Sequence, residues 1–292
     1  MASEESISLP KDTVIRPAPS PRSVASRYSA ELPPIPKPFY DVLTKYSKIP
    51  PNDVAQHMLA IQRKGWEIHS YPCIGRWYFM RLSLLDYPQW EDVLKAVKNG
   101  GVFLDVGAFM AVEVRALASR PGIDPQLLFA LDLAPEFLEL GFECFRDADR
   151  LVRDNFIAAD FFDDADDRVK ALRGKAAVVH AGAFLHLFTL EKATTAVCRM
   201  IELGRQQKGT LILGRVLGRR EAAHVMYKDA LRTLAYRHNW VSMKKMWEDA
   251  AERTGTKWDV WTKQRDIPRE PGKDEWLEPD SVVVVFCARR LS

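Results

Sequence analysis

The sequence predicts an α/β protein built around a mostly parallel, Rossmann-like sheet. From residue 101 onward, short apolar runs alternate with amphipathic helical segments, which is typical of parallel strands joined by helical crossovers. The runs are continuous in Val, Ile, Leu and Ala, so the strands are expected to be buried on both faces. Near the end of the chain, two β-rich runs follow each other without a helix, which predicts an antiparallel hairpin at the sheet edge. Together these runs give a sheet of seven strands.

Three segments are expected along the chain. Residues 1–37 are rich in Pro, Ser and charge, and such a segment cannot bury enough apolar surface to fold, so we predict a disordered tail. Residues 38–100 form helical patterns interrupted by an aromatic-rich stretch, and we expect an N-terminal helical cap that contributes to a substrate pocket. Residues 101–292 hold the alternating strands and helices of the core.

Each element follows from apolar periodicity and from the residues that interrupt it. In the cap, helical spacing predicts helices over residues 39–47, 52–69 and 89–101, with an irregular stretch broken by Pro and Gly over 71–88. Parallel strands are expected over residues 102–107, 127–132, 155–160, 176–182 and 209–215, and the edge hairpin over 257–263 and 280–290. Helices are expected over residues 112–120, 135–147, 166–173, 190–204 and 240–256.

The composition excludes several classes of function. The chain has 292 residues, 42 basic and 39 acidic side chains and a net charge of +3, which is too balanced to favour nucleic acid or an anionic membrane as partner. The longest apolar runs are too short to span a bilayer, and the start lacks the features of a secretory signal. The four cysteines have no metal-type spacing and are expected to be reduced thiols of a cytoplasmic protein.

Carboxylates stand at the ends of three successive predicted strands, at Asp105, Asp132 and Asp160. Open α/β sheets bind ligands at the carboxyl ends of their strands. An acid at the second strand end can accept hydrogen bonds from two ribose hydroxyls. An acid at the third can meet an adenine amine, while the aromatic face of Phe161 covers the ring. Gly107 lets the backbone approach the charged end of the ligand, so the pattern predicts a nucleoside site.

The turn after the first strand lacks the further glycines that such sites usually carry. In "FLDVGAFMAVEVR", residues 103–115, Phe109 and Ala111 stand where glycines would be expected after Gly107. The turn does not match the G-x-G-x-x-G fingerprint of nicotinamide-binding folds. A side chain at such a turn can obstruct a ligand or a positive φ, so the direction of the Phe109 ring decides whether a ligand fits.

Several stretches resemble a fungal family of methyltransferases of meroterpenoid and related secondary metabolism. They are "YPCIGRW", "GGVFLDVG", "DLAPEFLELGFECFRDAD", "FIAADFFD", "HAGAFLHLF" and "GTLILGR", and the resemblance covers roughly residues 38–265. It implies a class I methyltransferase fold, S-adenosyl-L-methionine as cofactor, and methyl transfer to a carboxylate or hydroxyl of a lipophilic intermediate. The cofactor-binding residues that it implies are Asp105, Gly107, Ala108, Asp132, Leu133, Asp160 and Phe161. The family normally keeps Gly where this chain has Ala111 and Asp where it has Glu113, so the first glycine motif is degenerate.

The acceptor side offers histidines and aromatic rings. His180 and His186 flank the end of the fourth strand, where either could act as catalytic base toward a phenol or alcohol, whereas a carboxylate acceptor needs no base. The alternative is that both are capping or core histidines. Tyr71, Trp77, Phe79 and His238 are candidate substrate-binding residues, with ordinary packing of the cap and core as the alternative.

Other functions stay open at this point. The altered first turn favours, as the main alternative, a methyltransferase fold that acts as a donor-independent isomerase or cyclase; a catalytically silent partner protein is a third reading. Asp163, Asp164 and Asp167 form a DDxxD pattern, which we interpret as an exposed acidic turn, so no metal site is expected. Arg219 and Arg220 could attract an acidic substrate or form a solvated pair. A small lipophilic substrate is the expected partner, and the sequence leaves a homodimer open.

Overall fold

One sheet of seven strands forms the centre of the molecule, in the order β4-β3-β2-β5-β6-β10-β9. The computed structural model describes residues 9–17, 20, 24–228, 234–269 and 274–292. Strands β4, β3, β2, β5 and β6 run parallel to one another, and β10 is antiparallel to both β6 and β9. This arrangement confirms the predicted fold class. The strands are β2 (Val102–Val106), β3 (Leu128–Asp132), β4 (Phe156–Ala158), β5 (Ala176–Gly182), β6 (Leu211–Arg219), β9 (Trp258–Asp266) and β10 (Ser281–Arg290).

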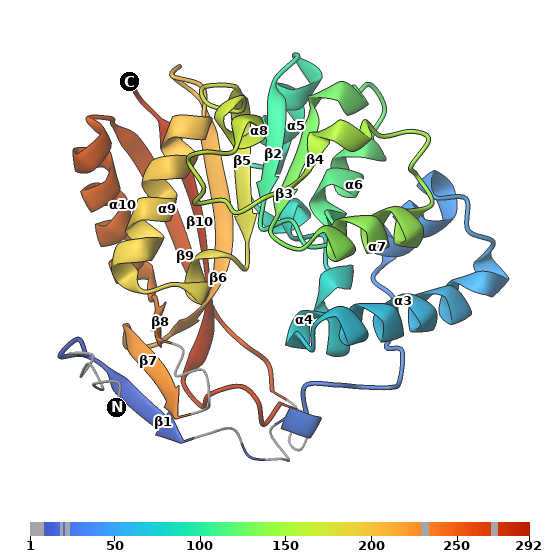
Figure 1. Cartoon of the computed structure of the whole chain (residues 1–292), viewed down its shortest axis with the longest axis horizontal. Coiled ribbons are helices and arrows are strands. Elements are labelled where there is room, and N and C mark those ends of the chain that lie inside the picture. The colour runs from blue at the N-terminus through green and yellow to red at the C-terminus, as the bar shows by residue number, and fades with distance from the viewer. Residues whose placement is uncertain (1–8, 18–19, 21–23, 229–233, 270–273) are drawn as a thin grey trace.

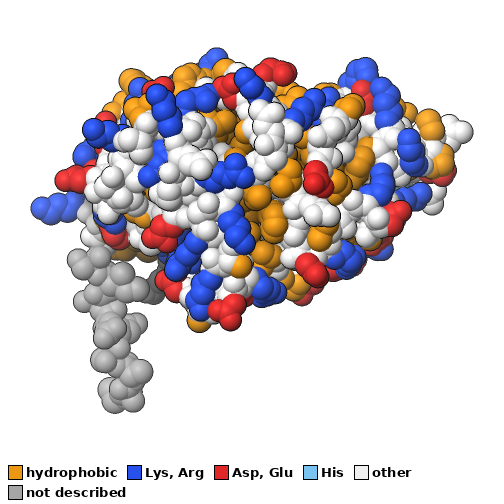
Figure 2. Space-filling model, turned by 90° about the horizontal axis from the view of Figure 1, so that it is seen from above, with side chains coloured by type: hydrophobic (Ala, Val, Ile, Leu, Met, Phe, Trp, Pro, Cys, Tyr) orange, Lys and Arg blue, Asp and Glu red, His pale blue; other side chains and the backbone are white. Residues whose placement is uncertain are grey.

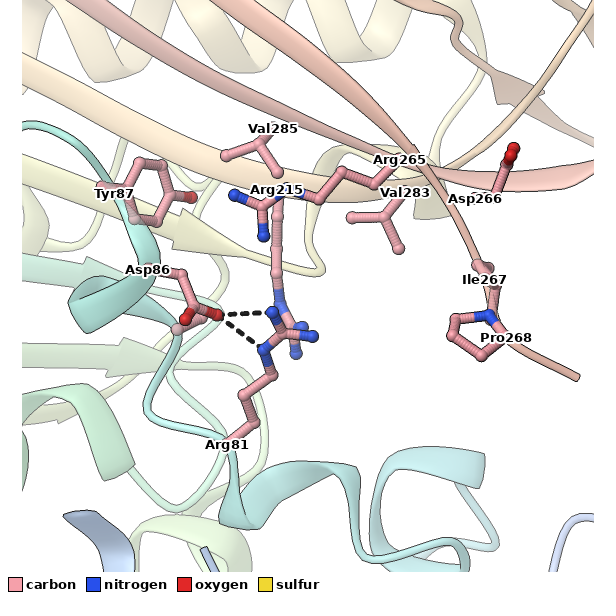
Figure 3. Close-up of a pocket in the computed structure, with 11 residues that line it drawn as sticks. Arg81, Asp86, Tyr87, Arg215, Arg265, Asp266, Ile267, Pro268, Val283 and Val285 are labelled. Carbon is pink, nitrogen blue, oxygen red and sulfur yellow. Dashed lines mark hydrogen bonds and ion pairs between the residues drawn. The ribbon is translucent and has the colours of Figure 1, made fainter. Parts of the chain in front are cut away.

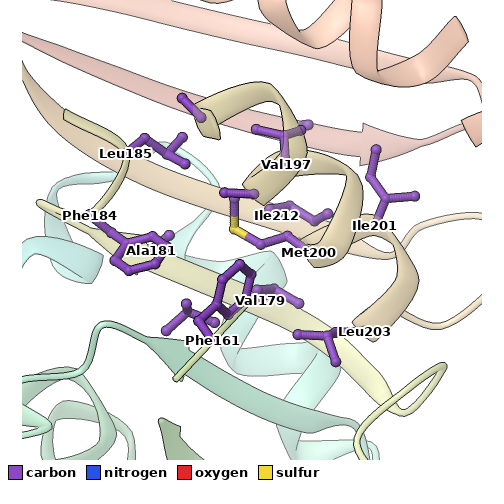
Figure 4. Close-up of a cluster of buried hydrophobic side chains, with 14 of the residues drawn as sticks. Phe161, Val179, Ala181, Phe184, Leu185, Val197, Met200, Ile201, Leu203 and Ile212 are labelled. Atoms are coloured by element: carbon purple, nitrogen blue, oxygen red, sulfur yellow. The ribbon is translucent and has the colours of Figure 1, made fainter. Parts of the chain in front are cut away.

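Helices cover both faces of this sheet, so the core has three layers (Figure 1). One face carries α9 (Leu190–Leu203) and α10 (Trp240–Thr254), and the other carries α5 (Trp90–Lys98), α6 (Val112–Ala118) and α7 (Pro135–Phe145). The short helix α8 (Asp167–Lys170) follows β4. Successive residues of a strand point to opposite faces, so Phe103 and Leu104 belong to different buried clusters. Figure 4 shows Met200 of α9 packed over Val179 and Ile212 of the sheet.

The segment before β2 forms a cap at the carboxyl ends of the parallel strands (Figure 1). It contains α2 (Lys37–Asp41), a π-helical turn (Val42–Tyr46), α3 (Val54–Ile68), α4 (Pro72–Gly75) and the 3₁₀ turns Pro51–Asp53, Tyr78–Met80 and Ser83–Asp86. Its apolar side chains, among them Phe39, Ile61 and Ile74, join Phe137 and Phe145 of α7 in one buried cluster. The cap is therefore packed onto the core through α7.

A second sheet of three strands, in the order β1-β7-β8, was not expected from the sequence. β7 (Ala223–Lys228) and β8 (Leu234–Arg237) form a hairpin after β6, and β1 (Val14–Pro17) pairs parallel with β7. The Asp12 carboxylate lies 2.8 Å from Nδ1 of His224 beside this pairing. The division into tail, cap and core stays a prediction, but the backbone of β7 orders part of the segment for which disorder was predicted. Of that segment, residues 1–8, 18–19 and 21–23 lie outside the described residues.

The surface carries charges of both signs. Figure 2 shows Lys and Arg side chains intermixed with Asp and Glu over the face that it presents, in keeping with the net charge of +3. Within the residues that the structure describes, no helix combines the length and the apolar character needed to cross a membrane.

A buried ion pair ties α6 to the chain after α7. Arg115 donates through Nε and Nη2 to the two carboxylate oxygens of Asp147, each at 3.0 Å, and both side chains are 0% exposed. The guanidinium also lies within 5.2 Å of the ring centroids of Phe142, Phe145 and Phe156. A buried charge that loses its partner is strongly destabilising, so this pair constrains how α6 and α7 pack.

We expect Arg115→Met to lower the free energy of unfolding by about 3 kcal/mol or more, because Asp147 is left buried without its cation. The matched control is Lys64→Met. Lys64 forms an ion pair with Glu143 in which both side chains are about half exposed. The substitution Lys64→Met should therefore change the free energy of unfolding by less than about 1 kcal/mol. Urea unfolding followed by circular dichroism measures both. Equal effects of the two substitutions would contradict a stabilising role for the buried pair.

Candidate functional site

The three strand-end carboxylates lie in different surroundings. Asp132 ends β3 and is half-buried, and Asp160 lies exposed in the turn after β4, where it accepts a hydrogen bond from the Phe162 N–H at 2.8 Å. Asp105 lies within β2, is 3% exposed and faces His180 of the neighbouring strand β5. The structure therefore brings Asp132 and Asp160 to the accessible edge of the sheet, while Asp105 is a buried residue beneath it.

Asp132 connects the turns that follow three neighbouring strands. Its Oδ2 accepts a hydrogen bond from the Phe109 N–H at 2.7 Å, and its Oδ1 accepts one from the Ala134 N–H at 2.9 Å. Its backbone carbonyl accepts the Ala159 N–H at 3.0 Å. Burial raises the pKa of Asp132, and the two N–H donors partly offset this effect. A carboxylate offers about four lone pairs, so one on each oxygen is left for ribose hydroxyls.

The turn after β2 has the backbone conformation of a glycine-rich turn, although Gly107 is followed by Phe109 and Ala111 instead of further glycines. Gly107, Phe109 and Ala111 all have positive φ, at 63°, 54° and 47°. A left-handed conformation costs a residue with a Cβ about 1–2 kcal/mol. The Ala108 N–H donates to the carbonyl of Leu131 at 3.1 Å, and together with the Asp132 carboxylate this bond holds the turn against β3. The degenerate glycine motif therefore places side chains on a turn whose backbone has the positive φ values that glycine favours.

The side chains of this turn point toward protein rather than across the strand ends. The Phe109 ring packs on Phe137 of α7, with the ring centroids 4.3 Å apart, and contacts the cap cluster. A Cβ at Gly107 would lie 2.6 Å from the Phe184 ring, so packing as well as a positive φ requires glycine there. Phe109 thus joins the cap, and the sequence alone could not predict that direction.

The other expected cofactor residues divide by exposure. Leu133 follows Asp132 and is 73% exposed, so its side chain presents an apolar surface beside that carboxylate. Ala108 is 5% exposed and belongs to the turn itself. Phe161 is 4% exposed, with its ring edge-to-face against Phe184 at 5.3 Å in the core cluster. Leu133, rather than the Phe161 ring, is therefore the exposed apolar side chain next to Asp132.

His180 is paired inside the core. Its Nδ1 lies 2.8 Å from Oδ1 of Asp105, and the side chain is 2% exposed. Burial raises the pKa of Asp105 to about 6 despite the histidine. Burial lowers the pKa of His180, but the Asp105 carboxylate raises it more, so the net direction is upward. A histidine that holds its proton against a buried carboxylate is poorly suited to accept one from an acceptor.

The other two histidines are weak bases. Burial, with the nearby Arg237 and Arg215 charges, lowers the pKa of His186 to about 3. Burial lowers the pKa of His238 to about 3, and its ring contacts Tyr236 and the Ser242 hydroxyl. His186 follows β5 and stays a candidate at the acceptor side. His238 follows β8, where its carbonyl accepts from the Arg219 N–H at the far end of β6.

The aromatic residues proposed for an acceptor wall lie mostly in the interior of the cap. Trp77 and Phe79 are 3% and 5% exposed, and their rings stack 6.0 Å apart in the cap cluster. They therefore pack the interior of the cap, where large rings bury much apolar surface. Tyr71 is 39% exposed and contacts Phe137, and partial burial, followed by the negative charge of Asp132, raises the Tyr71 pKa. Of these residues, Tyr71 is the one that lies beside the Asp132 carboxylate.

Glu113, at the first turn of α6, fastens the cap to the turn after β2. One of its oxygens accepts the Ser83 N–H at 2.6 Å and the Ser83 hydroxyl at 2.5 Å, and the other accepts the Leu84 N–H at 3.2 Å. The side chain is 5% exposed. The Glu113 side chain, one methylene longer than that of aspartate, therefore reaches the cap from α6.

A cavity of about 110 Å³ lies between the cap and the β6–β10–β9 part of the sheet (Figure 3). The residues that line it are Arg81, Ser83, Asp86, Tyr87, Arg215, Arg265, Asp266, Ile267, Pro268, Val283 and Val285. Sequence reasoning did not identify Arg215 or Arg265 and considered Arg219 and Arg220 instead. Those two are paired with Asp280 and Asp266. Arg215 lies two residues after the buried Leu213, so both side chains point to the same face of the strand. A charged residue on an otherwise apolar strand face was the signal that could have identified Arg215.

We expect Ala111→Gly to leave the free energy of unfolding within about 1 kcal/mol of the unsubstituted protein, because relief of the left-handed strain offsets the lost methyl contacts. Ala116→Gly is the control, since Ala116 is equally buried but lies in the interior of α6. It should lower stability by about 2 kcal/mol through the lost methyl and the poor helix propensity of glycine. Urea unfolding compares the two, and equal losses would show that Ala111 is unstrained.

The Asp105–His180 pair should make stability depend on pH. Both pKa values are higher in the folded chain, so the folded protein holds protons more tightly and loses stability as pH rises. Between about pH 5 and about pH 8, the free energy of unfolding should therefore fall more steeply for the unsubstituted protein than for Asp105→Asn. Parallel curves for the two proteins in urea unfolding would argue against this linkage.

Comparison with known proteins places the chain among methyltransferases. Residues 27–80 match the family model of the meroterpenoid methyltransferase N-terminal domain. The chain is 37% identical to O-methyltransferase phiE of Fungal sp. (strain ATCC 74256), over 76% of this chain and 74% of phiE. It is 34% identical to methyltransferase adrK of Penicillium roqueforti, over 85% of this chain and 87% of adrK. Methyltransferase trt5 of Aspergillus terreus is 32% identical, over 88% of this chain and 86% of trt5. The resemblance expected from the sequence is confirmed, and the chain belongs to this family of fungal methyltransferases.

Proposed function

We propose that this protein transfers a methyl group from S-adenosyl-L-methionine to a carboxylate oxygen of a small, lipophilic secondary metabolite of the meroterpenoid type. Membership of the family supports methyl transfer, and the name of the relative phiE, an O-methyltransferase, supports oxygen as the accepting atom. The choice of a carboxylate rests on His180, which is paired with Asp105, and on the low pKa of His186. The four cysteines, all free thiols, support a cytoplasmic location.

The residues at the carboxyl edge fit the donor. Asp132 keeps a free lone pair on each oxygen for ribose hydroxyls, and Leu133 presents an exposed apolar side chain beside it. Asp160, in the turn after the next strand, is exposed and could meet an adenine amine. The Phe109 ring contacts the cap cluster and leaves this edge to Asp132 and Leu133. When bound, the donor supplies a methyl group on a positively charged sulfur, a good leaving group.

The histidines determine which acceptor this site can serve. His180 is held by Asp105, and His186, with a pKa of about 3, draws a proton only weakly from a phenol or alcohol. A carboxylic acid is already ionised at neutral pH and needs no base. The protein then has to hold the carboxylate in line with the methyl group and exclude water, which is catalysis by proximity.

Donor binding is tested by calorimetry with S-adenosylhomocysteine. The unsubstituted protein should bind it, and Leu133→Asp should weaken binding at least tenfold, since the new charge replaces an apolar contact beside Asp132. Leu291→Asp, at another exposed leucine near the end of the chain, should bind as the unsubstituted protein does. If the unsubstituted protein does not bind, donor dependence is wrong, and the reading as a donor-independent isomerase or cyclase takes its place.

The acceptor class is tested with isotope-labelled donor and two probes, para-hexylbenzoic acid and para-hexylphenol. Label should enter the acid, and mild alkali should release it as methanol, because a methyl ester hydrolyses whereas an aryl ether does not. Label that enters the phenol and resists alkali would contradict the carboxylate assignment while leaving methyl transfer in place.

A further inference from the structure

The cavity between the cap and the sheet contains more positive charge than its own acids neutralise. Arg81 forms an ion pair with Asp86 at 2.6 Å. The carboxylate of Asp266 forms an ion pair at 2.7 Å with Arg220, which does not line the cavity. Arg215 and Arg265 are half-buried and have no hydrogen-bond or ion-pair partner for their guanidinium groups among the described residues. A half-buried cation without a counter-charge is unfavourable, so these two favour an anion in the cavity.

The two arginines have the chemistry to bind a carboxylate. Figure 3 shows the Arg215 side chain extending from β6 into the cavity and the guanidinium of Arg265 lying along the wall that Val285 forms. Guanidinium groups recognise planar anions through pairs of parallel N–H donors. The valines at the same wall exclude water from one side, which strengthens the attraction between opposite charges there.

A third donor completes this group. The Tyr87 hydroxyl is buried and has no hydrogen-bond partner in the described part of the chain, and the residue is 4% exposed. Burial raises the pKa of Tyr87 well above its usual value, so the hydroxyl keeps its proton and can donate it. In Figure 3 this hydroxyl points to the side of the cavity where the Arg265 guanidinium lies.

The cavity lies at the same sheet edge as the donor residues. Arg215 is in register with Gly182, the last residue of β5. The backbone carbonyl of Arg215 accepts a hydrogen bond from the Ala183 N–H at 2.8 Å. On the cap side, Ser83 lines the cavity and is bound to Glu113 of the helix that follows the turn after β2. An acid bound here therefore lies next to the end of β5, on the acceptor side of the site.

We propose that Arg215, Arg265 and Tyr87 form an anion subsite that binds a carboxylate of the acceptor and selects acids over neutral molecules. The assignment deepens the proposed function, on which it rests for the identity of the ligand as an acceptor. The three residues are positioning residues for the acidic group, and none of them is required for the donor.

Binding of para-fluorobenzoate, with the neutral para-fluorobenzamide as comparison, tests the subsite by fluorine NMR in the absence of donor. The unsubstituted full chain should bind the acid about tenfold more tightly than the amide or better, which is the scale of a charge-assisted hydrogen bond. Arg215→Met and Arg265→Met should each abolish most of this preference, and Tyr87→Phe should reduce it by a smaller factor. Lys257→Met, an exposed cation just before β9, is the control and should keep the preference.

The outcomes separate this subsite from the proposed function. Equal affinities for acid and amide, or loss of the preference in Lys257→Met as well, would overturn the subsite even where S-adenosylhomocysteine binds. Displacement of the acid by an equal concentration of inorganic phosphate would also overturn it, because the site would then be a general anion site. A preserved acid preference without S-adenosylhomocysteine binding would support the subsite and overturn the donor-dependent function. Circular dichroism of each variant shows that its fold is retained.

Discussion

The hydrogen bonds of Asp132 are the constraint on which the site depends. One carboxylate holds the turn after β2 through the Phe109 N–H and its own turn through the Ala134 N–H, while its carbonyl holds Ala159 after β4. Three loops that come from different strands are thereby fixed to one residue. The same carboxylate retains lone pairs for ribose hydroxyls. The group that we propose for ligand recognition is therefore also the group that holds these three turns together.

The turn after β2 shows that a glycine motif can lose its residues and keep its conformation. Phe109 and Ala111 adopt the positive φ values that glycine would adopt without strain. The surroundings hold them there: the Phe109 ring gains a contact with Phe137, and Ala111 is buried in the core. Strained residues of this kind persist where neighbouring interactions over-determine the backbone, and they gather at functional sites. The amino-acid sequence of the motif departs from the expected glycine pattern, but its backbone still adopts the positive φ values that glycine favours.

The sequence predicted the sheet well because its signals are local. Continuous apolar runs separated by helical spacing identified every strand of the large sheet, including the hairpin, whereas β1, β7 and β8 carry no such pattern and were missed. At the candidate site, the positions of Asp132 and Asp160 beside strand ends could be predicted because strand ends are visible in the sequence, and their role in donor binding stays a prediction. The pairing of His180 with Asp105 could not be predicted, since it depends on the register between β2 and β5. Arg215 was missed because the predicted strand ended at that residue, which hid its place on a buried strand face.

The carboxylate of Glu113 joins two parts of the molecule that are thirty residues apart in sequence. It binds Ser83 and Leu84 of the cap, next to the arginine-lined cavity, and it stands on the helix that begins at the strained turn. The cap residues beside the proposed acceptor cavity and the turn proposed to bind the donor are thus connected through one side chain. We expect a displacement of the cap to shift the turn after β2 as well, because Glu113 connects the two. In-line displacement at carbon depends on the alignment of the two reactants, and this connection would help to preserve it in the proposed transfer.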